Sequence, residues 1–389
     1  MFIMINHDDN GVSQDRTHRI KQVRGRRYLP HAYIERHILF IVCLFVLGVV
    51  AFFGVRTYHN AAGMFDKAYE SAHFDKARNA STLLKKGRPF SILLLGTDTG
   101  ELGRKYKGRT DSLMLVTINP KQHESRIVSI PRDTIIAPVG YEEAFPQKLN
   151  NAYNLGSAKT TMATIQTWLN VPVDYYALVN MGGIERIVNQ LGGIEVKSPL
   201  TFKYNPDTAH EDPGNLYQFK KGSAQFTHTG QDGITKTYHR MDGKAALAFS
   251  RMRYSDPEGD YGRQQRQRLV LQGIVHEAVT SPLTVTSQSF LSIVGQSMKT
   301  DMTFSDLKQL GGNYVAAAKT IKTDHFIGKS YDLPIGSSEF ISTAQKQRVT
   351  DELRKALDLP AKSTGPIYGG YVSEYQANQY GLPYTRLKY

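Results

Sequence analysis

One uninterrupted apolar stretch dominates the N-terminal part of this sequence. Residues 38–55 carry no charged side chain and are almost wholly hydrophobic. As a helix, these residues extend for roughly 27 Å, which is close to the thickness of the hydrocarbon core of a bilayer. A helix of that length buried in a soluble domain normally shows a polar stripe, and this stretch has none. We therefore predict a single transmembrane helix over residues 38–55.

Positive charge is distributed unevenly around this stretch. Residues 1–37 are rich in arginine and lysine, whereas Arg56 is the only such residue directly after the span. Basic segments stay on the cytoplasmic side, so we expect a cytoplasmic tail that contacts anionic lipids and an extracellular remainder. A cleaved signal peptide is the alternative, but no small-x-small site follows the apolar run cleanly. We expect a single-pass protein of the cell membrane.

Cysteine usage and net charge limit the compartment and the partners further. Cys43, the only cysteine, lies inside the predicted span, so the exported part has no disulfide bond. An exported domain of this kind is compatible with a Gram-positive-type envelope. The formal net charge of +13 suits either nucleic acid or polyanionic envelope polymers and lipid phosphates. The predicted topology favours the second class, and we expect no nucleic acid partner.

Changes in composition divide the exported part. Residues 56–88 carry apolar residues at helical spacing and predict a stalk helix. Residues 89–359 have the composition of a globular domain, within which residues 201–237 are rich in Gly, Pro, Asp, His and Thr and predict a long surface excursion. Residues 360–389 are rich in tyrosine and predict an extended tail.

Short apolar runs alternate with helical patterns through the globular domain. The runs typical of strands lie at 90–96, 112–119, 126–130, 176–179 and 324–333, and the helical patterns at 160–169, 183–191, 245–249, 261–279, 304–320 and 350–357. Such alternation is typical of an α/β protein. We predict an α/β/α sandwich around a central mixed sheet, preceded by a single transmembrane helix.

One aspartate follows the first predicted strand, and another precedes the second. Asp98 lies in the sequence Gly-Thr-Asp at the end of the first strand, and Asp111 lies just before the second. If the strands are neighbours, both loops meet at one edge of the sheet, where α/β folds bind ligands. Two carboxylates there would suit Mg²⁺, although aspartate is also common in turns for structural reasons alone.

Basic residues cluster at the ends of other predicted elements. The residues concerned are Arg109, Arg132, Lys148, Arg251, Arg253 and Arg263. Arg251 and Arg253 leave the same face if their segment is extended, a geometry that suits a diphosphate. Asp260 begins a helical pattern in which Arg263 and Gln267, four residues apart, share a face. An ordinary basic loop beside a solvated helix face is the alternative.

The motifs that contain these residues resemble the LytR-CpsA-Psr family of membrane-anchored cell-wall proteins. They are the GTD loop (96–98), GRTDSLMLVTINP (108–120), SIPRDT (129–134), KLNNAY (148–153), VDYYALVNMGGIERIVNQLGGIEV (173–196) and ALAFSRMRYSDPEGDYGRQQRQ (246–267). They occur in the family's order and cover most of residues 90–280. The resemblance extends to the basic tail and single span in front of them.

The resemblance implies a transferase that moves a glycopolymer from a polyprenyl-pyrophosphate carrier to peptidoglycan. Asp98 and Asp111 look like Mg²⁺ ligands. The residues that look like the pyrophosphate clamp are Arg109, Arg132, Arg251, Arg253 and Arg263, with Gln267 and the further cation Lys148 alongside. Asp260 and Asp133 are the acidic candidates nearest the chemistry, and Asp260 is the favoured general base.

Three other functions fit parts of the same sequence. A pyrophosphatase would use water in place of the wall hydroxyl and needs the same residues. A membrane-bound transcriptional attenuator would need its globular part in the cytoplasm, and no helix-turn-helix pattern is evident. A wall-binding module without catalytic activity would not depend on Asp260 or Arg251.

Overall fold

The computed structural model describes residues 63, 66–97 and 108–384. The predicted basic tail, the predicted span at 38–55 and Asp98 lie outside these residues. Within the described part of the chain, no helix combines the length and the apolar character needed to cross a bilayer. The described residues all belong to one compact unit.

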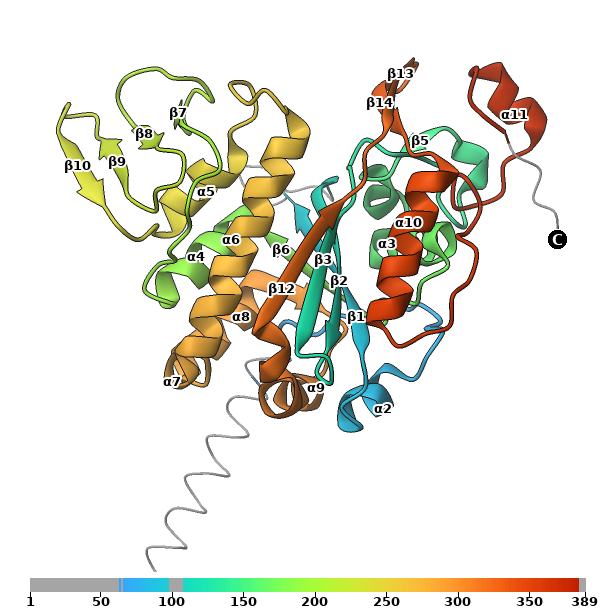
Figure 1. Ribbon diagram of the computed structural model, residues 1–389, viewed down its shortest axis with the longest axis horizontal. Helices are drawn as coiled ribbons and strands as arrows, with labels where there is room; N and C mark the ends of the chain where they lie inside the picture. Colours follow the sequence, from blue (N-terminus) through green and yellow to red (C-terminus); the bar gives the residue numbers. More distant parts are fainter. Residues whose placement is uncertain (1–62, 64–65, 98–107, 385–389) are drawn as a thin grey trace, which may run out of the picture. The chain divides into compact units, whose positions relative to one another are not determined.

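A six-stranded sheet forms the centre of this unit (Figure 1). Its strands, in spatial order, are β11 (Met298–Thr300), β6 (Tyr175–Asn180), β1 (Phe90–Thr97), β2 (Thr110–Asn119), β3 (Glu124–Ser129) and β12 (Thr320–His325). β1 pairs antiparallel with β2 and parallel with β6, so the sheet is mixed. The first four predicted strands are confirmed, as is the hairpin between β2 and β3.

Helices cover both faces of this sheet. Side chains alternate between the two faces along each strand, so neighbouring positions feed different cores. Leu93 joins the core under α3 (Asn151–Leu169) and α10 (Thr343–Ala356). Met114 joins a smaller cluster on the other face, under α6 (Asp260–Thr280). The expected α/β fold with helices flanking a mixed sheet is confirmed.

The segment expected to be a surface excursion forms a second sheet. Its strands are β7 (Phe202–Tyr204), β8 (Leu216–Phe219), β9 (Phe226–Thr229) and β10 (Thr235–Tyr238), all antiparallel. The aromatic rings of this sheet build their own core with α4 (Met181–Gln190) and α5 (Gly243–Arg251). The rings of Phe219 and Phe249 lie 5.2 Å apart in an edge-on arrangement.

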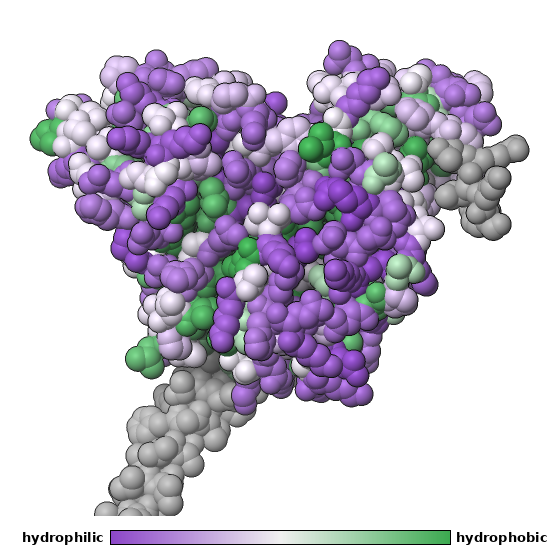
Figure 2. Space-filling view, viewed as in Figure 1, coloured by the Kyte–Doolittle hydropathy of each residue, from purple (hydrophilic) through white to green (hydrophobic). Residues whose placement is uncertain are grey.

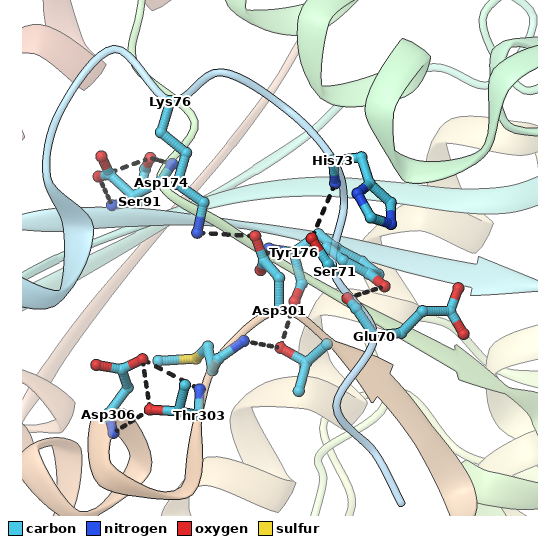
Figure 3. A network of polar contacts seen from close by, with 12 residues as sticks. Glu70, Ser71, His73, Lys76, Ser91, Asp174, Tyr176, Asp301, Thr303 and Asp306 are labelled. Carbon is cyan, nitrogen blue, oxygen red and sulfur yellow. Dashed lines mark hydrogen bonds and ion pairs between the residues drawn. The ribbon is translucent and has the colours of Figure 1, made fainter. Parts of the chain in front are cut away.

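The predicted stalk helix differs from the structure over its described residues. Residues 66–79 are not helical, and the N–H of Glu70 and the C=O of Ala68 bond to Thr300 at 2.8 and 2.9 Å, which extends the sheet beyond β11. Figure 3 shows the polar network beneath this segment, in which Lys76 pairs with Asp301 at 2.8 Å. Ala68 and Ala72, which the sequence placed on a free helix, are buried on the domain, whereas Tyr69 is exposed.

The C-terminal segment is also packed, although the sequence predicts an extended tail. The indole N–H of Trp168 donates to the carbonyl of Ile367 at 3.1 Å, and Tyr368 is fully buried beside Phe145. α11 (Glu374–Gln379) follows and closes a small hydrophobic cluster. Residues up to 384 therefore belong to the folded unit.

The remaining elements are short. They are α2 (Ala80–Lys85), β4 (Ile135–Ile136), β5 (Gln147–Lys148), α7 (Pro282–Val285), α8 (Gln288–Ser297), α9 (Phe304–Gln309), β13 (Lys329–Leu333) and β14 (Gly336–Phe340), with three short helical turns at 142–144, 310–314 and 315–318. The helix predicted over 304–320 is thus divided into an α-helical, a π-helical and a 3₁₀ segment. The strand predicted at 324–333 corresponds to the end of β12 and to β13.

Candidate active site

Three loops meet at the edge of the sheet where β1 ends and β2 begins. Thr97 pairs with Thr110, and the N–H of Thr110 donates to the carbonyl of Asn150 at 3.2 Å. The N–H of Asn150 in turn donates to the carbonyl of Arg132 at 3.0 Å. Lys148 is fixed through the pairing of β5 with β4. The motifs around residues 110, 132 and 148 are therefore joined by backbone hydrogen bonds.

A buried arginine holds the loop that leads into α6. Arg266 is fully buried, donates from Nε to the carbonyl of Phe249 at 3.0 Å, and is paired with Asp256 and with the carbonyl of Met252. A Cβ at Gly262 would lie 2.0 Å from an Asp256 oxygen, so glycine is needed for this close approach. These contacts fix the path of residues 252–259 before α6.

Charges from the loops and from the start of α6 form one cluster. Arg132 pairs with Asp111 at 2.6 Å and lies 3.5 Å from Asp133. The other pairs are Lys148 with Asp133 at 3.0 Å, Arg253 with Asp260 at 3.9 Å, and Arg263 with Asp260. Acidic and basic side chains from four separate stretches of sequence therefore share one site.

The surrounding charges and burial shift the pKa values of Arg132 and Arg263 in opposite directions. Burial alone would lower the pKa of Arg132, but Asp111, Asp260 and Asp133 together raise it above the ordinary value. Burial lowers the pKa of Arg263, and Arg132 and Arg253 add to that effect while Asp260 and Asp111 oppose it. The charged form of Arg263 is therefore less well compensated by its surroundings than that of Arg132.

Several polar atoms in this cluster are buried without a hydrogen-bond partner among the described residues. They include Nε of Arg132, Nε of Arg263 and Oε1 of Gln267, whereas Nη2 of Arg263 is ion-paired with Asp260. Buried donors are normally satisfied, so unsatisfied guanidinium donors side by side indicate a place for an acceptor-rich ligand. The first turn of α6 adds the positive end of a helix dipole. The site is suited to an anion with several oxygen atoms.

Most of the predicted site residues are brought together. Asp111, Arg132, Asp133, Lys148, Arg253, Asp260 and Arg263 form the cluster. Gln267 follows Arg263 by one turn on α6. Arg109 directly precedes β2 and is exposed, and Asp98 lies outside the described residues.

Arg251 does not lie as the sequence predicts. We expected Arg251 and Arg253 to share one face of an extended segment, but α5 continues through Arg251 and ends at Met252. The hydrophobic packing of α5 keeps the helix intact to that point. Arg251 influences the ionisation of Tyr204 in β7, whereas Arg253 faces Asp260.

Sequence reasoning missed two residues at the site. The hydroxyl of Tyr261 donates to the carboxylate of Glu339, and the N–H of Glu339 donates to the carbonyl of Asp133 at 2.8 Å. Arg268 donates to the hydroxyl of Ser129 at 2.8 Å, where β3 ends. No motif marks Glu339, but Arg268 continues the basic series on α6 that already includes Arg263.

The donor set permits a hard cation at this edge. Asp111 offers carboxylate oxygens and its side chain is 30% exposed. Mg²⁺ typically takes one or two carboxylates and completes its shell with phosphate oxygens and water, so a large protein cluster is not required. Among the described residues, no group of three or more His, Cys, Asp or Glu side chains is placed to hold a metal. The carboxylate of Asp111 is compatible with one ligand position of such a site.

Apolar side chains lie between α6 and the sheet, farther along the strands from the edge that carries the polar cluster. Ile92, Leu94, Leu271 and Ile321 are only partly buried there, around the cluster that contains Met114. Figure 2 shows hydrophobic patches on this face of the molecule among polar surroundings. A ligand with a charged group and an apolar chain would find surfaces for both parts.

Comparison with known proteins gives the same family as the motifs. Residues 51–355 match the profile of the LytR_cpsA_psr family. The chain is 34% identical over 323 residues to the polyisoprenyl-teichoic acid–peptidoglycan teichoic acid transferase TagU of Enterococcus faecalis, a match that covers 82% of this chain and 96% of that protein. Protein gbs0355 from Streptococcus agalactiae superposes with a TM-score of 0.63 at 29% identity, over 79% of this chain and 98% of that one. A structure described as TagT bound to LI-WTA superposes with a TM-score of 0.52 at 25% identity, over 70% of this chain and 92% of that one. This chain therefore belongs to the LytR_cpsA_psr family.

Proposed function

We propose that this protein transfers a glycopolymer, such as a teichoic acid or a capsular polysaccharide, from a polyprenyl-pyrophosphate carrier to peptidoglycan. The observation that carries the proposal is the set of unsatisfied guanidinium donors on Arg132 and Arg263 beside the carboxylate of Asp111. A diphosphate supplies the acceptors that these donors lack. The similarity to a named teichoic acid transferase supports the polymer and the acceptor.

The charged cluster would act on the diphosphate by neutralising it. Arg132, Arg253 and Arg263 donate to its oxygens, and Arg109 and Arg251 serve as further basic residues at the rim. Asp260 and Lys148 hold their partners in place. Guanidinium groups fixed in advance stabilise charge that grows in the transition state of phosphoryl transfer. Mg²⁺ held by Asp98 and Asp111 would supply further charge neutralisation.

The reaction is a displacement at phosphorus. A hydroxyl of a muramic acid residue attacks the sugar-side phosphorus, and polyprenyl phosphate leaves. The partly exposed apolar residues between α6 and the sheet would contact the first part of the prenyl chain. Residues 38–55 would anchor the protein in the cell membrane, with the catalytic domain outside and close to membrane lipids.

A transfer assay tests this proposal. The protein is incubated with Mg²⁺, a lipid-linked teichoic acid precursor and peptidoglycan, and the polymer bound to the wall and the released polyprenyl phosphate are measured. We expect both products in equal amounts, and loss of both with Asp111→Asn. Lys322→Ala, which alters an exposed lysine paired with Glu124, serves as the control. Release of lipid without any polymer on peptidoglycan would contradict the proposal.

A further inference from the structure

A carboxylate outside the motifs is built into the site. Glu339 belongs to β14, and its N–H bonds to the carbonyl of Asp133 while Thr134 forms a bridge with it. Gly328 approaches so closely that a Cβ there would lie 2.4 Å from Cγ of Glu339. Both the backbone and the side chain of Glu339 are therefore held in position.

The contacts of this carboxylate differ from those of the other acids in the cluster. Asp111, Asp133 and Asp260 are each paired with arginine or lysine. Glu339 instead accepts a hydrogen bond from the hydroxyl of Tyr261, and no cation among the described residues pairs with it. The N–H of Gly328 donates to that same hydroxyl at 3.0 Å, which fixes its orientation.

We propose that Glu339 is the general base that accepts the proton of the attacking hydroxyl. The proposal rests on the proposed transfer reaction. The O–H bond of the acceptor breaks as its oxygen bonds to phosphorus, the proton moves to the carboxylate of Glu339, and the bond to the bridging oxygen breaks. The electron pair of that bond leaves with polyprenyl phosphate, and Glu339 later releases its proton to water.

The surroundings of Glu339 suit this role. Burial raises the pKa of Glu339 to about 7, the nearby Asp260 and Asp133 act in the same direction, and the N–H of Gly328 opposes them. A base is most effective when its pKa lies near the working pH. Asp260, which the family resemblance favours as the base, is already neutralised by Arg263. His325 is a further titratable group near Tyr261: the two rings lie 5.7 Å apart, and burial lowers the pKa of His325.

The dependence of the transfer rate on pH tests the proposal. Because the ionised carboxylate accepts the proton, the single-turnover rate of the unaltered protein should rise with pH and level off above about 7. Glu339→Gln should lower that rate by about 10²–10⁴ and abolish the rise, while binding of a short prenyl diphosphate stays intact. Glu339→Asp retains a carboxylate and should retain the rise at a lower rate.

Two further variants separate a catalytic role from a structural one. Tyr261→Phe removes the hydrogen bond that stabilises the ionised carboxylate of Glu339. The rise of the transfer rate should therefore move to higher pH. Asp260→Asn should weaken diphosphate binding through Arg263 and keep the rise in rate, moved to lower pH because Asp260 no longer raises the pKa of Glu339. Asp332→Asn, an exposed carboxylate in the neighbouring strand β13, is the matched control and should change neither property.

The possible outcomes are distinct. A normal rate and an unchanged rise in Glu339→Gln would overturn the assignment of Glu339 while leaving the transfer reaction itself intact. Absence of transfer by the unaltered protein would instead overturn the proposed function. If a thermal unfolding measurement shows that Glu339→Gln does not fold, Tyr261→Phe provides the test instead. A transfer rate that rises over the same pH range in Tyr261→Phe as in the unaltered protein would contradict the proposal.

Discussion

Arg263 combines partial burial with unused hydrogen-bonding capacity. Its side chain is 12% exposed and Nη2 is ion-paired with Asp260, yet Nε has no hydrogen-bond partner among the described residues. Leaving buried donors unsatisfied costs stability in the free protein. A diphosphate that satisfies them recovers this cost on binding, which makes Arg263 a direct test of the anion site.

Arg263→Ala should weaken the binding of a prenyl diphosphate by about 10- to 100-fold, since a charge-assisted hydrogen bond contributes roughly 1.5–3 kcal/mol. Arg263→Lys should restore only part of the affinity, because an ammonium group lacks the planar fork. Equilibrium binding by calorimetry measures both. Arg126→Ala, which alters an arginine paired with Glu352, is the control. Equal affinities for all four proteins would show that the diphosphate binds elsewhere.

The sequence predicts which charged residues lie at the site better than it predicts the residues that contact them. Arg132 and Asp133 directly follow a predicted strand within a motif, so their place at the sheet edge follows from the strand pattern. Glu339 meets Tyr261 across 78 positions in the chain, through a hairpin that the sequence marks only weakly. Local patterns contain no information about that contact, because it depends on tertiary packing.

α6 and the loop before it connect the two hydrophobic cores to the site. Ile274 packs against the core of the small sheet, and Leu271 against the cluster on the central sheet. The apolar residues Leu271, Ile274, Val275 and Ala278 recur at helical spacing, but they are only partly buried. α6 packs against the small sheet and against the central sheet at the same time. Gly273 and Glu277 are therefore buried, although neither is a large apolar residue.

Arg266→Met should destabilise the fold by about 3–5 kcal/mol, because it leaves the carboxylate of Asp256 buried and unpaired. The double variant Asp256→Asn, Arg266→Met removes that charge and should be less destabilised than the single variant. Denaturant unfolding measures both free energies. Arg348→Met, which breaks a pair whose arginine is 44% exposed, should cost less than about 1 kcal/mol. A double variant at least as unstable as the single one would show that Arg266 acts through its carbonyl contacts alone.

For the whole molecule, the sequence predicts the central sheet and its helices but not the parts packed around them. Buried strands give continuous apolar runs, as in 90–97. The small sheet has strands of three or four residues joined by turns rich in Gly, Pro and Asp, which resemble an irregular loop. The C-terminal segment is held by isolated contacts such as the bond from Trp168 to Ile367, which leave no periodic pattern.

In the whole molecule, a charged cluster lies at one edge of the sheet, and partly buried apolar residues lie between α6 and the same sheet. A transferase and a pyrophosphatase would bind the diphosphate with the same residues and would differ only in the group that attacks phosphorus. The two functions differ in the nucleophile, which is a muramic acid hydroxyl in the transferase and water in the pyrophosphatase.

The most direct measurement is the fate of isotopic oxygen during turnover. The reaction is carried out in H₂¹⁸O with the lipid-linked polymer and peptidoglycan, and the products are analysed by mass spectrometry. We predict that the phosphate joining polymer to peptidoglycan contains no ¹⁸O and that polyprenyl phosphate is released unlabelled. Soluble polymer phosphate that carries one ¹⁸O atom, without polymer on the wall, would contradict transfer and identify hydrolysis.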